Sequence, residues 1–223
     1  MKIEQTSSAL NLLIIGANGG IGRQVVELAL EDGHKVTAVL RDPAKLSLRH
    51  INLTVVKGDI MQPETFEKYL ENKDAVISAI GASGGLFGDK PTTLYSEGNA
   101  NLLLAMKKMN VERAFFISAS AIEISPVLPW YVRFAAKHVI QKLLKNMYAD
   151  LREMETLIKE SDCTWTIIRP PQLTDRPLTG HYRFAINHFL KDCLKISRAD
   201  VAHFMINHIS DEATYRTVIE IGY

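Results

Sequence analysis

The segment Leu12–Gly22, with the sequence LLIIGANGGIG, constrains the fold of this chain more than any other. An apolar run that we expect to form a strand stops at a glycine-rich turn, and an apolar run with helical spacing follows. Gly16, Gly19 and Gly22 have the spacing G-x-x-G-x-x-G. The first lets the chain turn off the strand, the second lets backbone N–H groups approach a pyrophosphate, and the third lets the helix pack on the strand. We predict a dinucleotide site here; the alternative is an ordinary tight turn between a strand and a helix.

Strands and helices are expected to alternate through most of the chain. Apolar runs predict strands at Leu10–Ile15, Lys35–Leu40, Leu53–Lys57, Ala75–Ile80, Ala114–Ser118, Thr164–Arg169 and Val218–Ile221. Helices are expected at Ile21–Asp32, after Pro63, at Thr92–Met109 and at Arg198–His208. Short apolar strands separated by helices are typical of a parallel sheet covered on both faces. We therefore predict an α/β fold with a doubly wound, mostly parallel sheet.

One further expected helix is unusually long, from about Ala136 to Glu160. Its apolar residues recur with heptad-like spacing at Ile140, Leu144, Met147, Leu151, Met154 and Ile158. The run is short for a coiled coil, so we expect a helix packed on the sheet, with a surface end that could serve a dimer. The expected state is a monomer or a homodimer.

Composition excludes several classes of protein. The 223 residues are 47% hydrophobic, enough for one full-sized core, and the formal net charge is +1. That balance gives no electrostatic reason to expect binding to nucleic acid or to an anionic membrane. Residues 1–8 do not resemble a signal peptide, no apolar run is long enough to cross a bilayer, and the two cysteines form no disulfide framework. We expect a cytoplasmic protein.

The residues after the second predicted strand indicate which dinucleotide is bound. An NAD site usually has Asp or Glu there, whereas this chain has Arg41, then Asp42, and Lys45 three residues later. A guanidinium offers paired donors to a 2′-phosphate, and Lys45 adds a second positive charge. Asp42 could instead bind an NAD ribose or cap the next turn. We predict NADP(H), with NAD(H) as the less favoured cofactor.

Other strand ends complete the predicted cofactor site. Asp59 and Ile60 follow the third strand, where a carboxylate would lie near the adenine edge; a turn aspartate is nearly as good an interpretation. The fourth strand leads into Ala79, Ile80 and Gly81 and then the small-residue loop 82–88, which could pass close to ribose and nicotinamide or be a surface loop without a ligand. The set also includes Asn18, Gly20, Ile21, Ser118, Pro170 and Pro171.

A conventional short-chain dehydrogenase needs Tyr-x-x-x-Lys, in which the ammonium group lowers the pKa of the phenol. The one such pair here, Tyr69 and Lys73, precedes the fourth strand, far from the helix that normally carries it. We therefore reject that alcohol–ketone mechanism. The seven histidines form no metal-binding motif, so no metal is expected.

The chain nevertheless resembles the atypical short-chain dehydrogenase/reductase group, in its NAD(P)H-binding branch related to NmrA. More narrowly, it is similar to the biliverdin-IX beta reductase and flavin reductase (NADPH) family. The resemblance is carried by Gly16–Gly22, Val36–Asp42, Gly58–Asp59, Pro91–Thr93, Ser96–Gly98, Arg169–Pro171, Asp175–Gly180 with Tyr182, and Ser197–Met205. It implies a Rossmann core spanning residues 1–223 as a single domain, NADPH as cofactor, and hydride delivery to flavins or linear tetrapyrroles.

The chain departs from this family where a serine and a histidine line the substrate pocket. An ungapped comparison places Ala119, between Ser118 and Ser120, at the serine position and Gln172 at the histidine position. We expect Ser118, Ser120, Gln172 and Tyr182 to orient the acceptor, in a substrate pocket formed by 119–135 and 170–190. Trp130, Tyr131 and Phe134 either border a planar substrate or form a core or dimer cluster.

Two functions follow. The first is an NADPH-dependent reductase that transfers hydride to a flavin, quinone-like or tetrapyrrole-like acceptor. The alternative is a non-catalytic NADP(H)-sensing regulatory protein of the NmrA kind. Pro170–Pro171 is a candidate cis bond, although trans is the more common state of any such pair.

Overall fold

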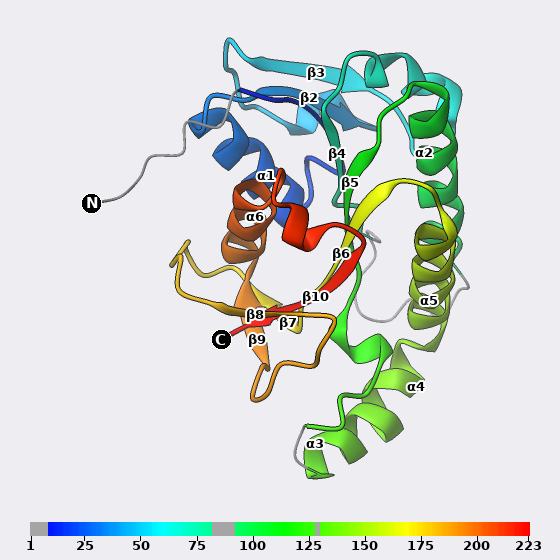
Figure 1. Cartoon of the computed structure of the whole chain (residues 1–223), viewed down its shortest axis with the longest axis vertical. Helices are drawn as coiled ribbons and strands as arrows, with labels where there is room; N and C mark the ends of the chain where they lie inside the picture. The colour runs from blue at the N-terminus through cyan, green and yellow to red at the C-terminus, as the bar shows by residue number, and fades with distance from the viewer. Residues whose placement is uncertain (1–8, 82–91, 128–129) are drawn as a thin grey trace.

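The computed structural model describes residues 9–81, 92–127 and 130–223. Its main sheet has eight strands in the order β3-β2-β1-β4-β5-β6-β10-β8 (Figure 1). These strands are β1 (Asn11–Ile15), β2 (Lys35–Leu40), β3 (Leu53–Lys57), β4 (Ala75–Ser78), β5 (Arg113–Ile117), β6 (Thr164–Arg169), β8 (Arg183–Ile186) and β10 (Thr217–Gly222). All pair in parallel except β8, which lies antiparallel to β10 at one edge. This confirms the predicted doubly wound, mostly parallel Rossmann sheet.

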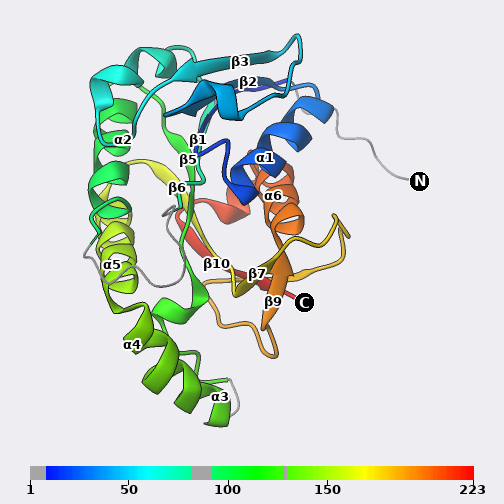
Figure 2. The ribbon, with the colours of Figure 1, turned by 180° about the vertical axis from the view of Figure 1, so that it is seen from behind.

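The helices in the described part of the chain are α1 (Gly20–Glu31), α2 (Ser96–Lys108), α3 (Trp130–Ala135), α4 (Gln141–Leu143), α5 (Lys145–Glu160) and α6 (Arg198–Asn207). Helices cover both faces of the sheet, whereas α3 and α4 extend away from it, as Figures 1 and 2 show. Helices α1 and α6 pack together on one face, and α2 and α5 on the other.

Strand β1 shows how the sequence produces this layering. Leu12 and Ile14 belong to the core beneath α1 and α6, whereas Leu13 and Ile15 belong to the core beneath α2 and α5. Successive side chains of a strand point to opposite faces, so a strand covered on both faces must be apolar at every position. The continuous run Leu12–Ile15 therefore places β1 in the middle of the sheet.

Three short strands were not predicted from the sequence. Gln172–Thr174 forms β7 and Lys195–Ser197 forms β9, which pair in parallel as a separate two-stranded sheet, and β8 is the third. Much of β7 and β8 is exposed or half-buried. Strands that are short and only partly covered carry no apolar run, so no sequence pattern predicts a strand there.

The prediction of a single helix from Ala136 to Glu160 was wrong for the first part of that range. A π-helical segment, Ala136–Ile140, joins α3 to α4, and the chain leaves helical geometry at Leu144 before α5 begins. Only α5 packs on the sheet, with Leu151, Met154 and Ile158 buried. Heptad spacing identified the buried face of α5 but did not detect the interruption, because apolar spacing does not encode a change of helical pitch.

Candidate cofactor and acceptor site

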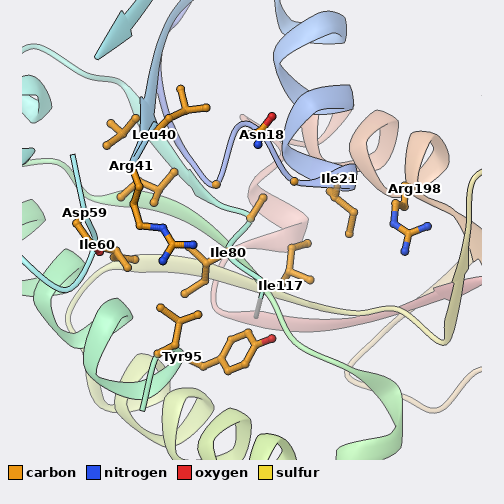
Figure 3. A pocket seen from close by; sticks show the side chains of 18 of the residues that line it. Asn18, Ile21, Leu40, Arg41, Asp59, Ile60, Ile80, Tyr95, Ile117 and Arg198 are labelled. Atoms are coloured by element: carbon orange, nitrogen blue, oxygen red, sulfur yellow. The ribbon is translucent and has the colours of Figure 1, made fainter. Parts of the chain in front are cut away.

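A cavity of about 600 Å³ lies along the carboxyl ends of β1 to β5 (Figure 3). The order of the strands reverses between β1 and β4, the point where ligands bind in open α/β sheets. The cavity is lined by Ile15, Gly16, Asn18, Gly19, Gly20, Ile21, Val39, Leu40, Arg41, Asp42, Lys45, Gly58, Asp59, Ile60, Ala79, Ile80, Gly81, Leu94, Tyr95, Ile117, Ser118, Ala119, Met147, Leu151, Leu173 and Arg198.

The glycine turn has the close approaches that its spacing predicts. Gly16 has φ +81°, and a Cβ there would lie 2.5 Å from the Ala79 carbonyl oxygen. A Cβ at Gly22 would lie 2.2 Å from the Gly16 carbonyl oxygen. Gly22 therefore serves helix packing and does not line the cavity, whereas Gly16 and Gly19 do.

The N-terminus of α1 opens into the cavity without a cap of its own. Gly19 stands at the N-cap position with no side-chain hydrogen bond, and the first turn contains no acidic residue. The first N–H groups of a helix have no partner within it, and the helix dipole favours an anion there. Gly20 and Ile21, at the start of α1, line the cavity, so a phosphate could approach the backbone closely.

Arg41 and Lys45 follow the end of β2 and line the cavity. Figure 3 shows Arg41 at one side of the cavity. Asp42 serves the turn, since its Oδ1 accepts a hydrogen bond from the Ala44 N–H at 3.2 Å. Its Oδ2 lies 3.9 Å from Lys45 Nζ. Asp42 therefore caps the next turn, which was the alternative interpretation of this residue. Arg41 and Lys45 both line the cavity.

Asp59 also has a structural role. Its Oδ1 accepts from the Met61 N–H at 3.0 Å, and its own N–H donates to Thr65 Oγ1 at 2.9 Å. Asp59 and Ile60 line the cavity, as do Ala79, Ile80 and Gly81 beyond the end of β4. The loop 82–88, which was also considered for the site, lies outside the described residues.

The part of the lining that comes from the end of β5, from α5 and from β7 is mostly apolar, and we call it the acceptor end. Ala119, Met147, Leu151 and Leu173 line it together with Ser118 and Tyr95. Asp150 on α5 accepts hydrogen bonds from the Tyr95 and Ser96 N–H groups at 3.0 and 2.9 Å, which fixes Tyr95 at the start of α2. Figure 3 shows the Tyr95 ring below Ile80 and Ile117.

The hydroxyl of Ser118 donates to Glu155 Oε1 at 2.7 Å, below the cavity wall. Arg169 donates to both oxygens of Glu155, from Nε at 2.8 Å and from Nη2 at 2.6 Å, and also contacts Glu123. Burial alone would raise the pKa of Glu155, but the hydrogen bonds from Arg169 bring that pKa below its ordinary value. Ser118 is thus held by a buried ion pair.

Glu220 lies beside this network, because β10 and β6 pair Glu220 with Arg169. Its Oε1 is buried without a hydrogen-bond partner among the described residues. Burial raises the pKa of this carboxyl to about 7, with Arg169 opposing the change and Glu123 and Glu155 adding to it.

Six residues of the expected site do not line the cavity: Gly22, Ser120, Pro170, Pro171, Gln172 and Tyr182. The Tyr182 hydroxyl lies 2.8 Å from His203 Nδ1, and its ring packs against Phe204 on α6. Gln172 is exposed on β7, whereas its neighbour Leu173 faces the cavity. Alternation along a strand separates these two side chains. No peptide bond in the described part of the chain is cis, so Pro170–Pro171 is trans.

The expected substrate segments contribute less than predicted. Of their described residues, Ala119 from 119–135 and Leu173 from 170–190 line the cavity. Trp130, Tyr131 and Phe134 are largely exposed on α3, so they neither border the cavity nor seal the core.

Arg198 and Tyr95 line the cavity, and sequence reasoning assigned neither to the site. Figure 3 places Arg198 on the side of the cavity opposite Arg41. A Cβ at Gly20 would lie 2.4 Å from Arg198 Cδ, so this side chain lies against the start of α1. Arg198 belongs to the segment Ser197–Met205 that resembles the reductase family, but only the fold brings it to the glycine turn.

These features fit a phosphorylated dinucleotide. An uncapped helix N-terminus and Arg198 stand where a pyrophosphate would lie, and Arg41 with Lys45 offers charge to a 2′-phosphate. A family of NAD(P)H-binding proteins matches residues 16–212. The chain belongs to this NAD(P)H-binding family. The match confirms the expected NAD(P)H-binding family.

Relatives of this NAD(P)H-binding chain have varied names. It is 27% identical over 217 residues to the uncharacterized sugar epimerase YhfK of Bacillus subtilis, covering 95% of this chain and 94% of that protein. It is 34% identical over 123 residues to the photosystem II assembly factor Ycf39 of Synechocystis, but the match covers 54% of this chain and 37% of Ycf39. Divinyl chlorophyllide a 8-vinyl-reductase of Arabidopsis thaliana is 26% identical over 235 residues, covering 96% of this chain and 53% of that protein.

Solved structures confirm the fold. A Veillonella parvula short-chain dehydrogenase/reductase in complex with NADP superposes with a TM-score of 0.74, at 19% identity, over 97% of this chain and 95% of that one. SP1627 of Streptococcus pneumoniae, described as a putative NADH-flavin reductase, gives 0.73 at 22% identity over 96% and 99%. In the described part of this chain, no helix is long and apolar enough to cross a membrane.

Proposed function

We propose that this chain is an NADPH-dependent reductase that transfers hydride to a planar acceptor, such as a flavin, a quinone or a tetrapyrrole. The proposal is based on one observation: the two ends of a single cavity differ in their chemistry. Arg41 and Lys45 supply positive charge at one end, whereas Met147, Leu151 and Leu173 form an apolar wall at the other. An apolar wall suits a flat ring system, and a charged end suits a phosphorylated cofactor.

The residues of the chain would bind and orient both molecules. The glycine turn and Arg198 hold the pyrophosphate, and Arg41 with Lys45 holds the 2′-phosphate. The reduced nicotinamide supplies the hydride. Tyr95 and Ser118 line the cavity near the acceptor end, where the Tyr95 hydroxyl can contact a ring carbonyl or nitrogen. The Ser118 hydroxyl donates its proton to Glu155, so its oxygen can only accept a hydrogen bond from a ring N–H.

The one proton that the acceptor takes up together with the hydride comes from water. The cavity lining contains no histidine among the described residues, and Asp42 and Asp59 lie at the charged end, bonded to their own turns. Acceptors that need no acid from the protein should therefore be reduced best.

Loss of reduced-nicotinamide absorbance tests this proposal. The purified chain would be mixed with NADPH or NADH and, separately, with FMN, riboflavin, dichlorophenolindophenol and biliverdin. We expect turnover with NADPH and the flavins or the dye, and much less with the Gly19→Val variant. NADPH binding by calorimetry without turnover of any acceptor would contradict the reductase and favour the sensor.

One observation favours that second function, an NADP(H)-sensing regulatory protein. The Ser118 hydroxyl donates its hydrogen bond to the buried Glu155 and not to an acceptor in the cavity. Tyr182, Gln172 and Ser120 do not line the cavity. A chain that only reported cofactor loading would need no acceptor-orienting groups. In that case NADPH should alter the protein's surface, for example its protease sensitivity, more than it supports turnover.

A further inference from the structure

The segment from α3 to α4 extends away from the body of the molecule, at the bottom of Figures 1 and 2. We call residues 130–143 the arm. Trp130 is 78% exposed, and Tyr131, Phe134, Val139 and Leu143 are also largely exposed. Trp130 and Tyr131 meet edge to face with ring centroids 6.1 Å apart, and Phe134 packs on His138 at 4.4 Å. Large side chains that gather in one exposed place usually mark an interaction surface.

The charged side chains of residues 124–149, which include the arm, all have one sign. Residues 124–149 contain Arg133, Lys137, Lys142 and Lys145 and no aspartate or glutamate. The formal net charge of +1 for the whole chain therefore becomes −3 for the remainder. The whole-chain charge, on which the expectation of no anionic membrane contact was based, averages over this asymmetry.

We propose that the arm docks on the surface of an anionic lipid bilayer. Interfacial helices combine Trp, Phe or Leu with Lys and Arg, so that apolar side chains enter the acyl boundary while cations meet the headgroups. Here the basic side chains of Arg133 and Lys137 lie among Trp130 and Phe134 along the same short helical run. Long basic side chains can extend to the headgroups while their stems stay apolar.

The shape and charge of the arm argue against other occupants. A symmetric contact with a second copy would bring two arms without any acidic residue together, and like charges would repel. The arm projects as a convex tip, which a deformable lipid surface accommodates without a matching groove. Helix α5 begins at Lys145, directly after the arm, and Met147 already lines the cavity. Docking would thus bring the acceptor end of the cavity close to the bilayer.

Vesicle flotation tests the docking. The full chain would be mixed with vesicles of phosphatidylcholine alone or of phosphatidylcholine and phosphatidylglycerol in equal amounts, at low and high salt. We expect flotation only with the anionic vesicles, weakened by salt. Trp130 gives a second readout: Trp165 is buried, so a blue shift of tryptophan emission on adding vesicles would report Trp130 entering lipid.

Two double variants and two matched controls complete the design. Lys137→Glu with Lys142→Glu should lower the vesicle partition coefficient at least about tenfold, and Trp130→Ala with Phe134→Ala should lower it similarly. Lys35→Glu with Lys191→Glu and Ile51→Ala with Leu104→Ala change exposed residues elsewhere and should leave it unchanged. NADPH affinity checks that every variant is folded.

Several results would overturn the docking proposal. Equal flotation with neutral and anionic vesicles, arm variants that float like the controls, or no flotation at all would each do so. Sedimentation velocity without lipid tests the other possible occupant, a second copy of the chain. A dimer that dissociates in the arm variants, together with no vesicle binding, would show that the arm binds that second copy.

Discussion

The side chain of Arg198, the first residue of α6, lies against Gly20, the first residue of α1. A Cβ at Gly20 would come within 2.4 Å of Arg198 Cδ and 2.7 Å of Nε. Asp175 accepts a hydrogen bond from Arg198 Nη1 at 2.6 Å and holds the side chain there. A charge from one end of the chain thus stands at the helix N-terminus formed at the other end.

This relationship predicts a cofactor effect that does not depend on the 2′-phosphate. Replacing Arg198 with alanine should weaken NADPH and NADH by similar factors, roughly tenfold, because the pyrophosphate is common to both. Calorimetry with each cofactor measures the effect, and Arg176→Ala, an exposed arginine outside the cavity, is the control. A loss confined to NADPH would mean that Arg198 does not contact the pyrophosphate.

Arg41 should show the opposite selectivity. Removing a charge-assisted contact costs on the order of 1.5–3 kcal/mol. Arg41→Ala should therefore weaken NADPH roughly tenfold to a hundredfold and leave NADH almost unchanged. Arg49→Ala, also exposed and not in the cavity lining, serves as the control. Our assignment of Arg41 fails if the wild type binds NADH as tightly as NADPH.

The glycines of the turn should separate binding from folding. A Cβ at Gly19 would lie 3.1 Å from the Gly16 carbonyl oxygen, whereas one at Gly22 would lie 2.2 Å from the same atom. Gly19→Val should abolish NADPH binding with a circular dichroism spectrum near that of the wild type. Gly22→Ala should lower the melting temperature, because backbone must move. If Gly19→Val still binds NADPH, the proposed place of the cofactor is wrong.

Glu220 should make stability depend on pH. Its pKa is raised to about 7 by burial, above the ordinary value of 4.5. The folded state therefore holds the proton more tightly than the unfolded state, so this contribution is fully present below about pH 4.5 and is lost as pH rises through about 7. Relative to Glu220→Gln, the wild type should lose on the order of 2–3 kcal/mol of unfolding free energy across that window. Urea unfolding of both proteins from pH 4 to 8 measures this difference, and a difference independent of pH would contradict it.

Ala119 should influence the choice of acceptor, and Gln172 should not. Ala119 lines the cavity, whereas Gln172 is exposed outside it. Ala119→Ser adds a hydroxyl at the acceptor end and should raise kcat/KM for biliverdin relative to FMN. Gln172→His, the matched control, should leave the ratio unchanged. An equal effect of both substitutions would mean that Gln172 reaches the acceptor, contrary to the geometry.

The local parts of the site were readable from the sequence. The glycine spacing of Gly16, Gly19 and Gly22 identified the turn, and the continuous apolar run of β1 identified a central, doubly covered strand. Arg41 and Lys45 follow β2 directly, so their place at the carboxyl edge of the sheet follows from strand direction alone. Each of these properties depends on neighbours within a few residues, which is why sequence patterns capture them.

Other parts were decided only by the tertiary structure. Leu173 lines the cavity and Gln172 does not, because of the way β7 is oriented. That orientation depends on the pairing of β7 with β9, more than twenty residues away in the sequence. The contact of Arg198 with Gly20, the burial of Tyr182 against α6 and the exposure of Trp130 depend on how distant elements pack. A local sequence pattern states which side chains are apolar or charged, but which of them meet is set by the packing of the whole chain.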